Sequence, residues 1–155
     1  IRTGEHFWCQ LFSEPGAGSD LAAVRTRAVA TEDGWVVDGQ KVWTSGAADA
    51  DYGLLLARTG GPGHAGLSAF VVAMDTPGIT VRPLQQMNGE SKFNEVFLDA
   101  VRIPHANVVG EVNGGWGPAR TTLSSEAGMI SGDESPPSQR AWITVFISRS
   151  TPRVR

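Results

Sequence analysis

Short apolar stretches separated by turn-forming residues run through most of the chain. Stretches of strand length, rich in Val, Leu, Phe or Trp, occur at 6–12, 52–59, 67–75, 79–84 and 94–104. Segment 25–44 is also rich in Val, Thr and Trp, and it contains two Asp-Gly pairs, Asp33-Gly34 and Asp38-Gly39, each of which predicts a tight hairpin. This pattern of six to eight closely spaced short strands predicts a mainly β fold, an antiparallel barrel or sandwich rather than a parallel sheet.

The periodicity changes after Gly114. Apolar residues recur there every three to four positions, at 116, 119, 123, 127 and 130, which predicts a helix. Residues 131–155 lose this spacing, because Pro136-Pro137 breaks a helix and WITVFI reads as an isolated apolar strand. We therefore expect a β domain over 1–112, the start of a helical C-terminal region over 113–130, and an atypical tail over 131–155 that does not continue the same design.

Composition narrows the class of protein. The 155 residues suffice for one domain with a core, and 13 basic against 16 acidic residues give no electrostatic footprint for nucleic acid or an anionic membrane, so neither partner is expected. A single cysteine, Cys9, cannot form an internal disulfide, and no run approaches the ~20 apolar residues of a membrane helix. We expect a cytoplasmic protein.

Because the chain begins with Ile1 and enters a strand almost at once, we also expect a fragment of a longer protein.

Several chemical motifs are excluded by their context. Gly61, Gly63 and Gly66 have the spacing of a dinucleotide loop, but the next predicted element is a strand instead of a helix, so a plain hairpin loop is expected. The three histidines are scattered without cysteine or carboxylate partners at ligand spacing, and no metal site is expected. No G-x-S-x-G elbow is present to support a hydrolase.

Two segments carry chemistry. In CQLFSEPGAGSD (9–20) a strand leads into a turn of small residues that lets backbone approach a planar ligand, and in DGQKVWTSGAADAD (38–51) a strand end presents Trp43 beside two hydroxyls. A flavin needs an aromatic or apolar contact for its dimethylbenzene side and hydroxyl or amide partners for its pyrimidine edge and N5. Each segment alone could be purely structural, with Trp43 as a core residue of a sheet and Ser13 and Ser45 as turn residues. The two segments together favour a flavin site.

At these residues the chain resembles the acyl-CoA dehydrogenase family. FSEPGAGSDLA (12–22), GQKVWTSGA (39–47), DTPGI (75–79), FNEVFLDAVRIP (93–104) and GEVNGGWGPA (110–119) match it in order and spacing, over residues 1 to about 130. Members combine an all-helical N-terminal domain, a β-barrel-like middle domain and a C-terminal helical bundle, and assemble as dimers or tetramers. The FNEV form resembles a branch common in bacterial lipid and sterol metabolism.

The resemblance implies a role for particular residues. Phe12 and Ser13 would bind the flavin pyrimidine edge, Trp43 would lie against the ring, and Thr44 and Ser45 would hold N5 and O4 of FAD. Ser19 would face the pantetheine or phosphate portion of an acyl-CoA thioester, and Gln10 would pass beside the ring. Lys41 and Glu14 are interpreted as structural.

The family's chemistry is α,β-dehydrogenation. A glutamate abstracts the α-proton of an acyl thioester, a β-hydride moves to flavin N5, and an electron-transfer flavoprotein or similar acceptor then takes the electrons. The resemblance implies that the usual base lies in the C-terminal bundle, which we expect to be outside this sequence. A minority carry it in an L-x-x-E-R pattern; here LSSEA (123–127) places Glu126 at that position, with Ala127 in place of arginine. The alternative for Glu126 is a surface position on an amphipathic helix.

Two functions remain open: part of a flavin-dependent dehydrogenase, or a non-catalytic β module that retains the fold and binds a partner. In the first case we expect the chain alone neither to hold FAD tightly nor to oxidise an acyl-CoA, since a β domain supplies one wall of a pocket that needs several.

Overall fold

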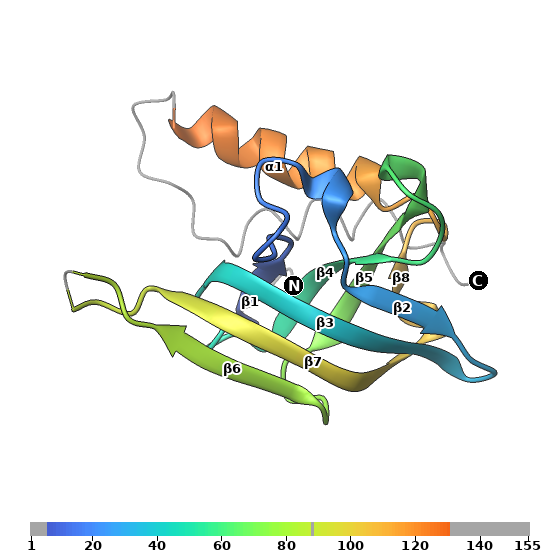
Figure 1. The fold of residues 1–155 in the computed structure, drawn as a ribbon, viewed down its shortest axis with the longest axis horizontal. Coiled ribbons are helices and arrows are strands. Elements are labelled where there is room, and N and C mark those ends of the chain that lie inside the picture. Colours follow the sequence, from blue (N-terminus) through green and yellow to red (C-terminus); the bar gives the residue numbers. More distant parts are fainter. Residues whose placement is uncertain (1–5, 88, 131–155) are drawn as a thin grey trace.

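The fold is mainly β, with one long helix at its C-terminal end. The computed structural model describes residues 6–87 and 89–130 (Figure 1). Its strands are β1 (Trp8–Leu11), β2 (Arg27–Ala30), β3 (Gly34–Ser45), β4 (Tyr52–Arg58), β5 (Leu67–Ala73), β6 (Ile79–Leu84), β7 (Phe93–Pro104) and β8 (Val108–Val109). The helix α1 spans Trp116–Ile130, and short 3-10 turns lie at Leu21–Ala23 (η1), His64–Gly66 (η2) and His105–Asn107 (η3).

The strands form a single sheet that folds over on itself. Its order is β6-β7-β3-β2-β4-β5-β8, with β1 paired to β4 off this path. The two halves join where β2 meets β4 through one residue pair, Arg27 with Arg58. The sheet is open, so the fold is sandwich-like and not a closed barrel. The predicted antiparallel arrangement is confirmed for most pairs, whereas β4 pairs in parallel with β1 and β2.

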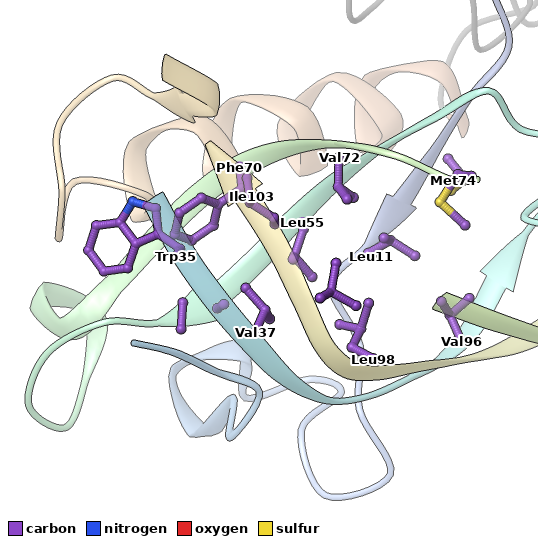
Figure 2. Close-up of a cluster of buried hydrophobic side chains, with 14 of the residues drawn as sticks. Leu11, Trp35, Val37, Leu55, Phe70, Val72, Met74, Val96, Leu98 and Ile103 are labelled. Atoms are coloured by element: carbon purple, nitrogen blue, oxygen red, sulfur yellow. The ribbon is translucent and has the colours of Figure 1, made fainter. Parts of the chain in front are cut away.

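The main hydrophobic core fills the space between the two halves. β3 and β7 contribute Trp35, Val37, Val96, Leu98, Val101 and Ile103, and these pack with Leu55, Phe70 and Val72 of β4 and β5 (Figure 2). Val37, Leu55, Phe70, Val96 and Val101 are fully buried. Apolar side chains alternate along β3 and β7 because only one face of that half meets the core.

Strand β4 is buried on both faces. Leu55 and Ala57 point into the main core, whereas Leu54 and Leu56 belong to a second cluster with Phe12, Val24 and Ala119. The second cluster lies beneath α1 and the loop that follows β1. This double burial explains the unbroken apolar sequence LLLA, because a strand covered on both sides has no solvent face to make polar.

One of the two predicted Asp-Gly hairpins is wrong. Asp33-Gly34 does turn the chain from β2 into β3, where Thr31 N donates to Gly34 O at 2.8 Å. Asp38-Gly39 instead lies inside β3, at a register shift opposite β7, and the Asp38 carboxylate accepts a hydrogen bond from Ala100 N at 2.8 Å. The strand continues because β7 pairs with β3 on both sides of this irregularity, so that cross-strand pairing outweighs the local turn preference.

Helix α1 begins where the sequence predicted it. A Cβ at Gly115 would lie 2.5 Å from backbone atoms of Ser68 and Ala69, so glycine permits the close approach of the helix start to β5. Ala119 and Thr122 are buried on the face that packs against the sheet. None of the helices in the described ranges is long and apolar enough to cross a membrane. The expectations for residues 131–155 lie outside the described residues.

The glycine-rich segment around Gly61, Gly63 and Gly66 links antiparallel β4 and β5, as predicted, and contains only the short turn η2. It has no helix whose amides could receive a pyrophosphate.

Candidate functional site

The two segments singled out in the sequence lie side by side. Val42 N donates a hydrogen bond to Ser13 O at 2.9 Å, and the Lys41 ammonium donates one to Phe12 O at 3.1 Å. The end of β1 therefore runs directly against the last part of β3, although 29 residues separate Phe12 from Lys41 in the chain.

Trp43 has an unusual backbone conformation and an exposed ring. Its φ is 60°, in the left-handed region that residues other than glycine rarely adopt, and its side chain is 61% exposed. The register of β3 against β7 shifts between Lys41 and Thr44, so Trp43 lies at an irregularity of the sheet. Its only described ring contact is an edge-to-face one with Phe93, at 6.0 Å between centroids. Such conformations cost free energy and cluster at functional sites.

Thr44 and Ser45 end the same strand. Thr44 is 2% exposed, and its Oγ1 atom is buried without a hydrogen-bond partner within the described part of the chain. Its backbone oxygen accepts a hydrogen bond from Asn94 Nδ2 at 3.0 Å. Ser45 is exposed and lies opposite Phe93 of β7. A buried hydroxyl without a partner is a group that a polar ligand edge can satisfy.

Ser13 is half-buried, and the other candidates lie around it. Phe12 is buried in the cluster beneath α1. Gln10, also half-buried, lies on β1 opposite Leu54. Ser19 is exposed in the turn that follows Ser13, where Gly16 and Gly18 have open space around them. Glu126 lies within α1, and its side chain is not among those that the structure describes. The roles of all these residues stay predictions.

A buried ion pair joins the two segments, with one residue from each. Lys41 is fully buried, and its Nζ lies 2.8 Å from Oε1 of Glu14, which is itself 7% exposed. Lys41 Nζ also donates to Leu56 O at 2.7 Å, and the Glu14 carboxylate accepts from the backbone N–H groups of Arg25 and Thr26 at 2.7 and 2.9 Å. The sequence interpretation of both residues as structural agrees with this position.

The surroundings shift the pKa of both charged groups. Burial raises the pKa of the Glu14 carboxyl, but the Lys41 ammonium and the hydrogen bonds to the carboxylate outweigh burial and hold it below its ordinary value. Burial lowers the pKa of Lys41 to about 8, although the Glu14 charge opposes the change. Both groups are therefore charged at neutral pH, although the Lys41 side chain is fully buried and that of Glu14 nearly so.

Two residues beside Trp43 and Thr44 were missed in the sequence. Phe93 and Asn94 come from β7, about 50 residues away, and only the register of β3 with β7 brings them to the site. The apolar-polar alternation of β7 predicts a strand but does not say which strand it pairs with.

Within residues 6–87 and 89–130, no cluster of His, Cys, Asp or Glu side chains is placed to hold a metal ion. A shallow hollow lies on α1, lined by Gly117, Arg120, Thr121 and Ser124. None of the candidate residues whose side chains the structure describes lines it.

Comparison with known proteins gives one consistent result. The family model described as acyl-CoA dehydrogenase, middle domain, matches residues 9–101. Acyl-CoA dehydrogenase FadE34 of Mycobacterium tuberculosis is 59% identical over 125 residues, covering 79% of this chain and 18% of that protein. Acyl-CoA dehydrogenase IpdE1 of the same organism is 49% identical over 131 residues, covering 83% of this chain and 34% of that protein.

A solved structure gives the same relation. A variant of the Tcur3481-Tcur3483 steroid ACAD superposes with a TM-score of 0.76 at 40% identity, over 80% of this chain and 33% of that one. The chain thus spans from about a fifth to a third of the length of the proteins it matches.

Proposed function

Because the chain belongs to the acyl-CoA dehydrogenase family and matches its middle domain, we propose that it forms one wall of an FAD site in an enzyme that dehydrogenates an acyl-CoA thioester between its α and β carbons. The observation that carries the proposal is the contact between the Phe12–Ser13 and Val42–Ser45 segments. The second segment contains Trp43, whose ring is exposed and whose φ is 60°. Residues up to 112 are the flavin-binding unit, and α1 opens a helical region.

The residues present fit a flavin. The Trp43 ring is exposed enough to lie against an apolar part of the cofactor, and Phe93 supports its edge. Oγ1 of Thr44, which has no hydrogen-bond partner among the described residues, and the exposed hydroxyl of Ser45 follow directly, where a polar ring edge needs donors. The cofactor, when bound, supplies a hydride acceptor for the β-carbon of the substrate.

The protein's part in this reaction is to position groups and to exclude water. Backbone and hydroxyl groups of Phe12, Ser13, Thr44 and Ser45 orient the polar edge of the cofactor, with Gln10 beside the strand that carries them. The exposed turn with Ser19 faces the pantetheine or phosphate part of the thioester, because Gly16 and Gly18, which precede Ser19, leave space for it. The proton at the α-carbon is removed by a carboxylate of a helical region, for which Glu126 is the candidate in this chain.

The remaining walls come from outside the β unit. Tight cofactor sites bury about 70–90% of a ligand's surface, which one sheet edge cannot do. We infer that helical domains and a second subunit complete the site, and that an electron-transfer flavoprotein or similar acceptor reoxidises the cofactor.

The site assignment is tested by titrating the purified chain with FAD and following backbone and indole signals by ¹⁵N NMR. We expect weak binding that shifts the signals of Phe12, Ser13, Thr44, Ser45 and the Trp43 indole. Binding should weaken in Trp43→Leu and in Thr44→Val, where Thr44→Val removes only a hydroxyl. Val29→Ala, at an exposed position on β2, is the matched control and should bind like the wild type.

Shifts confined to other strands, or no shift at millimolar FAD, would refute this assignment and favour a non-catalytic β module. Acyl-CoA substrates of short, branched and steroid type are then added and dye reduction is followed; the steroid type is included because the similar solved structure is a steroid ACAD. We expect no turnover by this chain alone. Turnover that survives dialysis and disappears in Glu126→Gln would overturn that expectation and make Glu126 the base.

A further inference from the structure

The buried Lys41–Glu14 pair is not explained by stability alone. Lys41 is among the largest fully buried side chains of the described residues, and it lies on β3 opposite the buried Val96 of β7. Replacing a buried ion pair with apolar residues of similar volume is often neutral or stabilising, because two charges have to be removed from water. The retention of a charged pair at this place therefore points to something that apolar residues cannot do.

The ammonium connects its own strand, β3, to the segment that follows β1 and to β4. Its three hydrogen bonds go to Phe12 O, Glu14 Oε1 and Leu56 O, at 3.1, 2.8 and 2.7 Å, which uses every donor that a lysine has. A methionine or leucine in its place would fill the volume but would leave the Phe12 carbonyl without this donor. The orientation of the peptide group between Phe12 and Ser13 therefore depends on Lys41.

The pair lies where the sheet itself gives little support. Between Lys41 and Thr44 the register of β3 against β7 shifts, and Trp43 adopts its left-handed conformation there. On one side of this irregularity, the Asn94 amide holds Thr44 O. On the other side, the contacts are Val42 N with Ser13 O and Lys41 with Phe12 O and Glu14.

We propose that Lys41 and Glu14 are positioning residues of the flavin site, which fix the carbonyls of Phe12 and Ser13 relative to the backbone of Trp43 and Thr44. This inference rests on the function proposed above. Glu14 contributes in two ways: it directs the ammonium toward Phe12 O, and it joins the turn after Ser13 to the backbone of Arg25 and Thr26. Neither side chain touches the cofactor, because both are enclosed by the protein.

The decisive variant is the double substitution Lys41→Met with Glu14→Leu. It replaces the pair with apolar side chains of similar size but leaves Phe12 O, Leu56 O and the N–H groups of Arg25 and Thr26 without these hydrogen bonds. Urea unfolding is therefore measured first, and FAD is titrated under conditions in which the variant is folded. We expect FAD affinity to fall about tenfold or more, the cost of one well-placed hydrogen bond. We also expect the amide signals of Ser13, Val42 and Trp43 to move before any FAD is added.

Ile103→Ala is the control for lost stability. Ile103 is 2% exposed on β7, opposite Trp35 at the far end of β3 from Trp43. This variant should be less stable than the wild type but should bind FAD with unchanged affinity, as measured by the same Trp43 indole shifts.

The outcomes are distinct. Wild-type affinity in a stable double variant, with unmoved signals at Ser13 and Trp43, would overturn the positioning role and leave the flavin site in place. Absence of any FAD-dependent shift in the wild type would overturn the proposed function itself, and the positioning role with it. Weakened binding in the double variant together with normal binding in Ile103→Ala supports the proposal.

Discussion

Removing the negative partner of the buried pair should make the stability of the protein depend on pH in a defined way. In Glu14→Gln the side-chain volume is kept, but the Lys41 ammonium remains fully buried with two carbonyl acceptors and no counter-charge. Breaking a buried pair in this way costs about 3–5 kcal/mol. The wild-type free energy of unfolding is about 5–15 kcal/mol for a domain of this kind. We therefore expect a folded variant that has lost about 3 kcal/mol at pH 6.

The sign of the pH dependence follows from Lys41. Its pKa is already lowered to about 8 by burial, and removal of the Glu14 charge, which opposes this shift, lowers it further. Between the lower pKa of the variant and that of the wild type, the unfolded variant binds more protons than the folded one, so its stability rises with pH. Each pH unit in this window restores up to about 1.4 kcal/mol. The difference in the free energy of unfolding between variant and wild type should thus be largest at pH 6. It should be smaller at pH 8, where Lys41 is deprotonated in the folded variant.

The measurement is urea unfolding of both proteins at pH 6, 7, 8 and 9, followed by tryptophan fluorescence. Glu90→Gln is the matched control, because Glu90 forms an exposed pair with Lys92, with side chains 50% and 70% exposed. That pair should contribute at most about 1 kcal/mol. A loss in Glu14→Gln that is no larger than in the control, or that is equally large at pH 6 and pH 9, would refute the reasoning.

Two further pairs of substitutions, each a test and its control, examine the core and a turn by urea unfolding. Leu55→Ala, at a fully buried position opposite Phe70, should lose about 2–5 kcal/mol, whereas Val29→Ala, 47% exposed, should change stability by no more than about 0.5 kcal/mol; similar values for both would contradict the core described above. Gly78→Ala should lose about 1–3 kcal/mol, because Gly78 has a φ of +95° and a Cβ there would collide with Asp99 O, whereas Gly61→Ala meets open space and should be close to neutral. A neutral Gly78→Ala would show that the turn into β6 relaxes freely.

The candidate site was predictable from the sequence to the extent that it is local. Phe12 with Ser13 and Trp43 with Thr44 stand in contiguous motifs whose residue types suit a flavin, and the resemblance joined the two motifs before their contact was known. The places of Phe93 and Asn94, and the burial of the Thr44 hydroxyl, were not predictable in this way. They depend on which strand pairs with β3 and on a register shift, and both are long-range properties.

Local pattern determined most of the elements. Alternation and turn residues located the strands at 52–59, 67–75 and 79–84, the Asp33-Gly34 hairpin and the helix after Gly114, because hydrophobic periodicity and turn chemistry act over a few residues. Tertiary structure decided the rest. In the structure, β3 continues through Asp38-Gly39, and the sheet is open, although a barrel was one of the predicted alternatives. Strand β4 is buried on both faces, and Lys41 lies in the core. The physical reason is long-range contact: pairing between distant strands outweighs a local turn preference, and the Glu14 carboxylate with two backbone carbonyls offsets the burial of the Lys41 charge. None of these contacts is visible along the chain.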